Sequence, residues 1–367
     1  MSTRTDGLSE QLRHLRVADW KPVAQLRTTT TSVPRAAHPV IDIHNHLGRW
    51  LTATGDIPFA SRPWAISDPG ALVGLMDRCN LQLIVNLDGM WGAEVTTNVA
   101  RYDEAYPGRF VTFCQLDWRL LATGDPVASL RRSLKDSVDR GARGLKVWKD
   151  LGLTVRDASG SLVMPDDPRV IDILGYAGEL GLPVVIHSAD PLAFFEPLDE
   201  RNERVDELLD RPDWWFGDRT AYPAFDHVYA AHRALVSACP GTTFIGAHVG
   251  CLAEDLDRVG AMLDACPNYL VDIAARLGEI GRQPRRFAAF VEQHPARVCF
   301  GTDIPPTPEL SEAYFRFLET TDEGFAYEPG ADVPPQGRWS ISGAGLTDAH
   351  LRAVYRDNAA AVLGLAG

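Results

Sequence analysis

Short apolar runs and longer amphipathic segments alternate along the chain. The runs are rich in β-branched and aromatic residues, as buried strands are, and the segments between them place apolar residues at helical spacing. The runs are Val40–His44, Leu81–Leu87, Phe110–Leu116, Gly144–Trp148, Pro183–His187, Thr243–Ala247, Tyr269–Ile273 and Val298–Thr302. The predicted helices are Pro69–Asn80, Val127–Arg140, Pro168–Leu180, Glu254–Cys266 and Arg285–Gln293. Asp68 is a suitable cap for the first of them, with Pro69 at its first position.

This alternation predicts an α/β fold with a parallel sheet. Eight strands over about 260 residues match a (β/α)8 TIM barrel, whereas a doubly wound open sheet more often has about five or six. Such a sheet also has a glycine-rich first turn, and no G-x-G-x-x-G follows the run Val40–His44. We therefore predict a (β/α)8 TIM barrel.

The regions outside the barrel are expected to decorate one domain, because no linker-like composition divides the chain. Residues 1–38 are predicted to be an N-terminal extension, residues 39–303 the metal-binding barrel, and residues 304–367 a C-terminal extension that packs on it. The last part has a proline-rich segment and then a helix from about Thr347 to Leu365. The longest break in the rhythm, between His187 and Thr243, is an aromatic insertion after the fifth strand, where a barrel carries its catalytic face. It is expected to form a lid or a pocket wall.

Composition narrows the functional classes. The chain has 367 residues, of which 45% are hydrophobic and 23% charged, so disorder as the main state is excluded. The formal net charge of −13 argues against nucleic acid and anionic membranes as partners. No basic stretch leads into an apolar run at the start, and no run of about 18 apolar residues occurs, so we expect a soluble, cytoplasmic protein.

The six cysteines are scattered and form no C-x-x-C pair. Most lie in apolar or helix-end contexts, which predicts reduced, packed thiols. A cysteine nucleophile is the less favoured interpretation.

Histidine and aspartate residues gather at the predicted strand ends. His44 and His46 lie two residues apart after the first strand, which places them on one side of it, and His187, His248 and Asp303 end later strands. One H-x-H pair is a weak signal, but repetition at several strand ends predicts one ligand cluster at the barrel mouth. Imidazole with carboxylate suits Zn²⁺, Mn²⁺, Fe²⁺ or Ni²⁺ better than Ca²⁺ or Mg²⁺.

These motifs, D-x-H-x-H after the first strand, histidines after the fifth and sixth, and G-T-D at the eighth, resemble the amidohydrolase superfamily. The nearest branch is the "amidohydrolase 2" group, which includes the aminocarboxymuconate-semialdehyde decarboxylase-like enzymes. The resemblance runs from Ile41 to Ala360. It implies metal ligation by His44, His46, His187 and Asp303, with His248 either a ligand of a second metal or a catalytic hydrogen-bonding group.

Lys146, in the run Gly144–Trp148, bears on the number of metals. In superfamily members similar to dihydroorotases and hydantoinases, a lysine in such a context is carbamylated and bridges two metals. The alternative is an interior lysine paired with a carboxylate such as Asp42 or Asp303. Lys149 is a less favoured bridge, because strand parity separates it from Lys146 and it directly precedes Asp150. The implied cofactor is one or two divalent transition metals (Zn, Mn or Fe).

Aromatic residues cluster after the strand ends, where they would face the mouth. Seven of nine tryptophans are placed there, which indicates a bulky, largely apolar small-molecule substrate. We predict substrate contacts from Trp50, Trp148, Phe194, Trp214, Trp215 and Arg276. Arg49, Arg119 and Arg276 could clamp a carboxylate, or could form structural ion pairs.

The preferred interpretation is a metal-dependent hydrolase in which a metal-bound hydroxide attacks an amide, lactam or ester carbonyl. Asp303 would accept the water proton and pass it to the leaving group, and His248 would polarise the carbonyl unless it binds metal. The first alternative is non-oxidative decarboxylation of an aromatic or unsaturated acid at one metal. The second is a nonheme diiron oxygenase, and a different class is a metal-free binding module. A homo-oligomer is left open.

Overall fold

The structure is a computed structural model that describes residues 10–16, 19–20, 22–49, 61–331 and 333–365. Its strands are all parallel and form two hydrogen-bonded sheets, in the orders β1-β2-β3 and β4-β5-β6-β7-β8-β9. The strands are β1 Val40–Asn45, β2 Leu81–Asn86, β3 Phe110–Thr112, β4 Cys114–Gln115, β5 Leu145–Val147, β6 Val184–Ile186, β7 Phe244–Gly246, β8 Tyr269–Asp272 and β9 Val298–Cys299.

Backbone hydrogen bonds connect the two sheets at both junctions. The predicted strand Phe110–Leu116 is divided at Phe113 into β3 and β4. The N–H of Phe113 donates to Asn86 O in β2 over 2.9 Å. At the other junction, next to β9, the N–H of Ile43 in β1 donates to Phe300 O over 3.0 Å. With β3 and β4 counted as one, the eight predicted strands are present in order. The predicted α/β fold, a TIM barrel, is confirmed.

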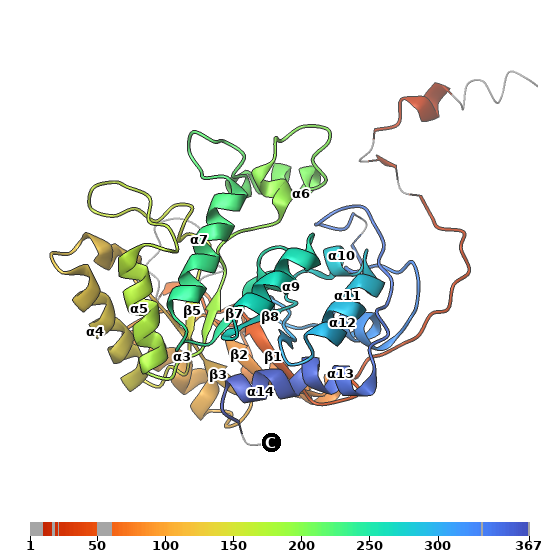
Figure 1. Ribbon diagram of the computed structural model, residues 1–367. Helices are drawn as coiled ribbons and strands as arrows, with labels where there is room; N and C mark the ends of the chain where they lie inside the picture. Colours follow the sequence, from red (N-terminus) through yellow and green to blue (C-terminus); the bar gives the residue numbers. More distant parts are fainter. Residues whose placement is uncertain (1–9, 17–18, 21, 50–60, 332, 366–367) are drawn as a thin grey trace, which may run out of the picture.

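Helices surround the strands (Figure 1). The main ones are α2 Pro69–Cys79, α3 Ala93–Val99, α4 Pro126–Asp139, α5 Pro168–Glu179, α7 Phe225–Ala238, α9 Leu256–Ala265, α11 Pro284–Gln293 and α12 Pro308–Glu319. Aspartate caps begin several of them, and Asp68 accepts hydrogen bonds from the N–H groups of Gly70 and Ala71. The α12 helix was not predicted. It lies in the proline-rich segment, where Pro308 occupies the first turn after the cap Thr307, a position at which a proline favours a helix.

The chain ends in a helical segment made of α13 Asp348–Arg352, a π-helical turn at Ala353–Asp357 and α14 Asn358–Val362. Ala359 and Ala360 pack against the inner core of the barrel, which includes Ile41, Ile43 and Val185. A larger apolar core lies between the strands and the surrounding helices. The six cysteines are buried and free of disulfides, as expected.

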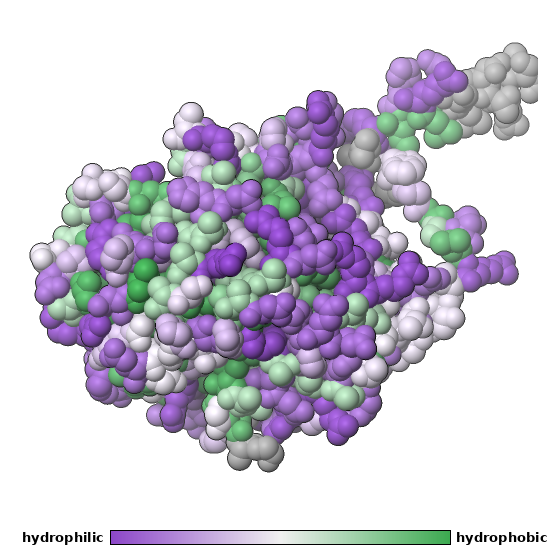
Figure 2. All heavy atoms as spheres, in the orientation of Figure 1, coloured by the Kyte–Doolittle hydropathy of each residue, from purple (hydrophilic) through white to green (hydrophobic). Residues whose placement is uncertain are grey.

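The insertion after β6 carries four short or medium helical pieces: the 3₁₀ turn Leu192–Phe195, α6 Val205–Asp210, the 3₁₀ turn Pro212–Trp214, and α7. On the face shown in Figure 2, hydrophobic residues are scattered among hydrophilic ones. In the part of the chain that the structure describes, no helix is both long and apolar enough to cross a bilayer.

Candidate metal centre

The two histidines at the end of β1 are held by carboxylates at the ends of other strands. His44 Nδ1 lies 2.8 Å from Asp272 Oδ2, and His46 Nδ1 lies 2.7 Å from Asp88 Oδ1. Asp272 ends β8, and Asp88 follows β2. A carboxylate on Nδ1 fixes the proton there and leaves Nε2 as a lone-pair donor, which is the common arrangement of metal-binding histidines.

Both Nε2 atoms point at Asp303. Asp303 Oδ1 lies 3.1 Å from His44 Nε2 and 3.4 Å from His46 Nε2. Its backbone has a φ of 75°, in the left-handed region that non-glycine residues rarely adopt, and its N–H donates to His44 O over 2.8 Å. Burial raises the pKa of Asp303, but His248, His44 and His46 outweigh that effect and hold it well below its usual range. Asp303 is therefore a carboxylate.

His248 lies directly after β7 beside His44, with 4.8 Å between ring centroids. Its Nδ1 donates to Ala274 O over 2.8 Å, and its backbone N–H donates to Asp272 Oδ1 over 2.9 Å. The backbone is left-handed at His248 and at Val249, with φ values of 58° and 57°. Burial, with Arg276 as the next cause, lowers the pKa of His248 well below its ordinary value. The ring is thus neutral, with Nε2 unprotonated.

His187, after β6, stands beside this group. Its ring centroid is 4.4 Å from that of His248, and its Nε2 lies 3.2 Å from Asp190 Oδ1. Asp190 also accepts a hydrogen bond from Lys149 Nζ. His187 Nδ1 is buried without a hydrogen-bond partner among the described residues. Burial lowers the pKa of His187 to about 4, so it too is neutral at pH 7.

Lys146 reaches the same point from β5. Its Nζ lies 3.0 Å from His44 Nε2 and 4.9 Å from the centroid of the Trp148 ring. Burial lowers the pKa of Lys146 to about 8, against the opposing effect of Asp303. Asp42, considered as its ion-pair partner, is engaged elsewhere: it accepts hydrogen bonds from Thr302 Oγ1 at 2.6 Å and Asn45 Nδ2 at 2.8 Å.

The donor set fits a transition-metal ion. Among the described residues, two groups have ligand atoms within 4.8 Å of one another: His44, His46 and Asp303, and His44, His248 and Asp272. Asp272 already accepts from His44 Nδ1 and from the N–H groups of His248 and Ala274, so it supports ligands better than it binds metal. Imidazole nitrogens converging on a low-pKa carboxylate suit Zn²⁺, Mn²⁺ or Fe²⁺.

The cavity at this centre has a volume of about 780 Å³. Of the predicted residues, it is lined by His46, Trp148, His187, Phe194, Trp214, His248, Arg276 and Asp303. Phe194 and Trp214 stack with centroids 6.1 Å apart, and Arg276 is 6% exposed. Tyr314, Tyr327 and Leu310 add walls that the sequence did not point to.

Two predicted substrate contacts are not part of this lining. Trp215 does not line the cavity; its indole N–H donates to Glu196 O over 2.8 Å, so the ring packs within the insertion. Trp50 falls outside the described residues. Arg49 and Arg119 form ion pairs instead, with Glu94 at 3.5 Å and with Asp117 at 2.7 Å.

Three carboxylates escaped the sequence analysis, although each stands near a strand end: Asp88, Asp190 and Asp272. Asp272 lies inside the predicted run Tyr269–Ile273, and Asp88 follows the run Leu81–Leu87 directly. The position at a strand end was the available signal. The same signal identifies the histidines and Asp303.

A protein-family model described as "Amidohydrolase" matches residues 41–365. The chain belongs to the amidohydrolase family. Several solved structures of similar fold cover 89% of this chain at low sequence identity. No sequence among curated proteins matches the chain significantly.

Two of the similar structures are decarboxylases. One is the 2,6-dihydroxybenzoate decarboxylase from Rhizobium, 14% identical, with a TM-score of 0.55 and 99% of that chain covered. Another is a dihydroxybenzoic acid decarboxylase from Polaromonas sp. JS666 with bound manganese and 2-nitroresorcinol, 14% identical, with a TM-score of 0.56 and 97% covered. A third structure is an amidohydrolase from Burkholderia multivorans with bound zinc, 14% identical, with a TM-score of 0.51 and 100% covered. These similarities show a shared fold.

Proposed function

We propose that this amidohydrolase is a metal-dependent hydrolase acting on the carbonyl group of an amide, lactam or ester. The observation that carries the proposal is the position of Lys146, whose buried Nζ lies 3.0 Å from His44 Nε2. An amine with a pKa of about 8 is partly neutral near pH 7 to 8 and can add CO₂, releasing a proton and forming a carbamate. The carbamate would place two oxygens that share one negative charge within the ligand cluster.

The ligands in this proposal are His44, His46, His187 and Asp303, with Lys146 as the bridging group if two ions bind. A divalent metal held there would polarise a carbonyl and lower the pKa of water. Asp88 and Asp272 hold the rings of His46 and His44 in the orientation that directs Nε2 toward Asp303.

Asp303 is the proton carrier in this scheme. As a carboxylate at pH 7 it can accept the proton of the attacking water and deliver it to the leaving group. His248 is better suited to accept a proton or bind a metal than to donate a hydrogen bond to the carbonyl. Its single ring proton is directed from Nδ1 to Ala274 O, and a low pKa keeps Nε2 bare.

A second candidate, decarboxylation of an unsaturated acid, is favoured by Arg276. This buried guanidinium lines the cavity and donates to the neighbouring Ala275 O over 2.8 Å. A guanidinium has five N–H donors, so others can serve a carboxylate. Its charge also acts on Glu207 and Glu254, whose pKa values are raised by burial. These acids would compete with a substrate carboxylate, and we therefore rank hydrolysis first.

Metal analysis and a substrate panel test the proposal. Purified protein is expected to contain stoichiometric zinc, manganese or iron, and to hydrolyse aryl esters or lactones with activity that a chelator removes and metal restores. 2,6-Dihydroxybenzoate is the matched decarboxylase probe, followed by CO₂ release. Release of CO₂ without ester or lactone hydrolysis would replace the proposal with the second candidate, and coupled O₂ consumption would point to the oxygenase. Absence of bound metal would contradict all three.

A further inference from the structure

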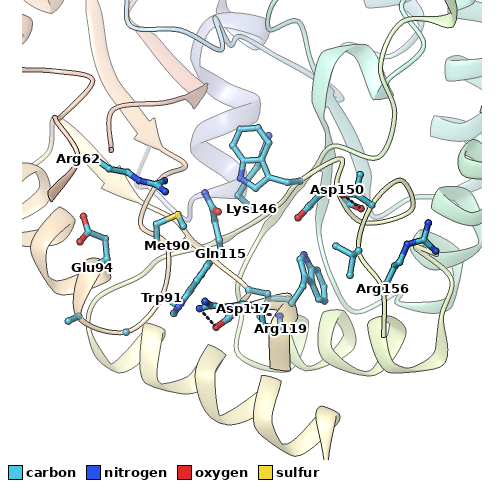
Figure 3. Close-up of a pocket in the computed structure, with 17 residues that line it drawn as sticks. Arg62, Met90, Trp91, Glu94, Gln115, Asp117, Arg119, Lys146, Asp150 and Arg156 are labelled. Carbon is cyan, nitrogen blue, oxygen red and sulfur yellow. Dashed lines mark hydrogen bonds and ion pairs between the residues drawn. The ribbon is translucent and has the colours of Figure 1, made fainter. Parts of the chain in front are cut away.

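A second hollow adjoins the metal cavity on the same end of the barrel. This outer chamber, as we call it, has a volume of about 1000 Å³. The segments after β2, β4 and β5 build it, and its described lining includes Met90–Glu94, Gln115–Arg119 and Thr154–Arg156. Figure 3 shows Lys146 and Gln115 between Arg62 and Glu94 on one side and Asp150 and Arg156 on the other.

The outer chamber and the metal cavity share part of their walls. Met90, Gln115, Trp148 and Asp150 line both of them. Trp148 stands at the junction, with its ring centroid 4.8 Å from that of His46. A ligand that occupied both hollows would therefore lie against Trp148.

The lining of the outer chamber is aromatic and near charge balance. Trp91, Trp118 and Trp148 contribute three indoles, and Met90, Leu116 and Val155 add apolar contacts. The acidic and basic residues other than Lys146 are Arg62, Arg119 and Arg156 against Glu94, Asp117 and Asp150. Arg119 is already bound to both Asp117 oxygens, at 2.7 and 2.8 Å. Such a surface selects flat apolar rings and gives an anion little advantage.

A single-ring substrate would use only one of the two hollows. Ordinary ligand pockets measure about 300 to 1000 Å³, so the metal cavity alone would accommodate a benzoate-sized acid and leave the outer chamber empty. A substrate that uses both must be elongated.

We propose that the substrate is a neutral carbonyl compound with a body of two or more rings. Its carbonyl end lies at the histidine cluster, and its ring body lies in the outer chamber against Trp91, Trp118 and Trp148. The carbonyl part of this inference rests on the proposed hydrolase function. The ring body rests on the outer chamber alone.

Aryl methyl ketones test the ring body without any reaction, because they cannot be hydrolysed. Acetophenone, 2-acetonaphthone and 1-acetylpyrene carry the same acetyl group on one, two and four rings, and their binding can be followed by calorimetry and tryptophan quenching. We expect affinity to rise at least about tenfold from the first to the last. Loss of one aromatic contact of about 1 kcal/mol corresponds to an about fivefold loss of affinity. Trp118→Ala should therefore weaken acetylpyrene binding by about that factor. Acetophenone binding should change less than about twofold.

Variants separate specific binding from general apolar adsorption. Val155→Trp narrows the outer chamber, because an indole replaces an isopropyl group, and should weaken acetylpyrene binding while acetophenone still binds. Trp215→Ala is the matched control, because this indole lines neither hollow. Equal effects of Trp118→Ala on both ketones, or unchanged acetylpyrene binding in Val155→Trp, would overturn the inference. Failure of ester hydrolysis with intact ketone selection would instead contradict the hydrolase function and leave the outer chamber assignment standing.

Discussion

Asp272→Asn tests how much the carboxylate that holds His44, a proposed metal ligand, contributes to metal binding. Asp272 Oδ2 faces His44 Nδ1 at 2.8 Å, while Oδ1 accepts the N–H groups of His248 at 2.9 Å and Ala274 at 3.0 Å. Asparagine has one oxygen and one NH₂ group. If the amide oxygen accepts from His44, the NH₂ group faces two backbone N–H donors. If the oxygen accepts from those backbone groups, the NH₂ group faces the Nδ1–H donor of His44. Either placement leaves one side unsatisfied.

The expected loss of metal affinity follows from this geometry. Replacing the carboxylate partner of a ligating histidine lowers metal affinity by about 10 to 100-fold, or about 1.4 to 2.7 kcal/mol. Competition titration with a chromogenic zinc chelator would measure it, with circular dichroism to confirm the fold. Asp303→Asn should lose more affinity than Asp272→Asn, because it removes a proposed ligand. Asp226→Asn, at a surface ion pair with Arg258, is the control and should change nothing. Affinity of Asp272→Asn within twofold of wild type would refute the reasoning.

Three further predictions address the bridge, the pH response and the insertion. Lys146→Ala should lower bound metal from about two ions to one or fewer per chain by elemental analysis, with partial rescue of activity by short carboxylic acids; an unchanged count would favour one metal. Burial lowers the pKa of His232 from about 6.5 to about 3. Between these pH values the unfolded chain binds more protons than the folded chain, so stability decreases as the pH falls. Denaturant titration of His232→Gln should therefore show about 2 kcal/mol less loss between pH 7 and 5 than wild type, and equal losses would exclude this group. Trp214→Ala should raise KM for bulky substrates, whereas Trp215→Ala should mainly lower Tm; similar KM values for both would contradict the different placement of the two indoles.

The alternation of strands and helices was sufficient to predict the barrel because each βα unit has the same pattern of apolar and capping residues. Buried parallel strands need continuous apolar runs, and the intervening helices need caps and an apolar face. The sequence did not reveal the break at Phe113. A phenylalanine between apolar neighbours looks like any strand residue, and its irregular pairing depends on partners elsewhere in the chain.

The clustering of the histidines was predictable because a histidine ending an apolar strand is uncommon, whereas aspartates after strands are ordinary loop residues. Asp88 and Asp272 became recognisable as supports only when the barrel brought them within 2.8 Å of His46 and His44. The separation of Trp214 from Trp215 likewise depends on the 3₁₀ turn that ends at Trp214. Adjacent residues leave such a turn in different directions, which no composition argument resolves.

The left-handed backbone at His248 and Val249 costs stability but fixes the orientation of the His248 imidazole. A β-branched residue at a φ of 57° costs about 1 to 3 kcal/mol, and a glycine there would adopt the same conformation with little strain. Val249→Gly is thus a substitution that stability engineering would favour on backbone grounds, although it also removes a buried side chain. The same change would free the peptide next to His248 to sample other conformations. Thermostable variants selected for folding alone are therefore expected to lose the fixed imidazole orientation first at this position.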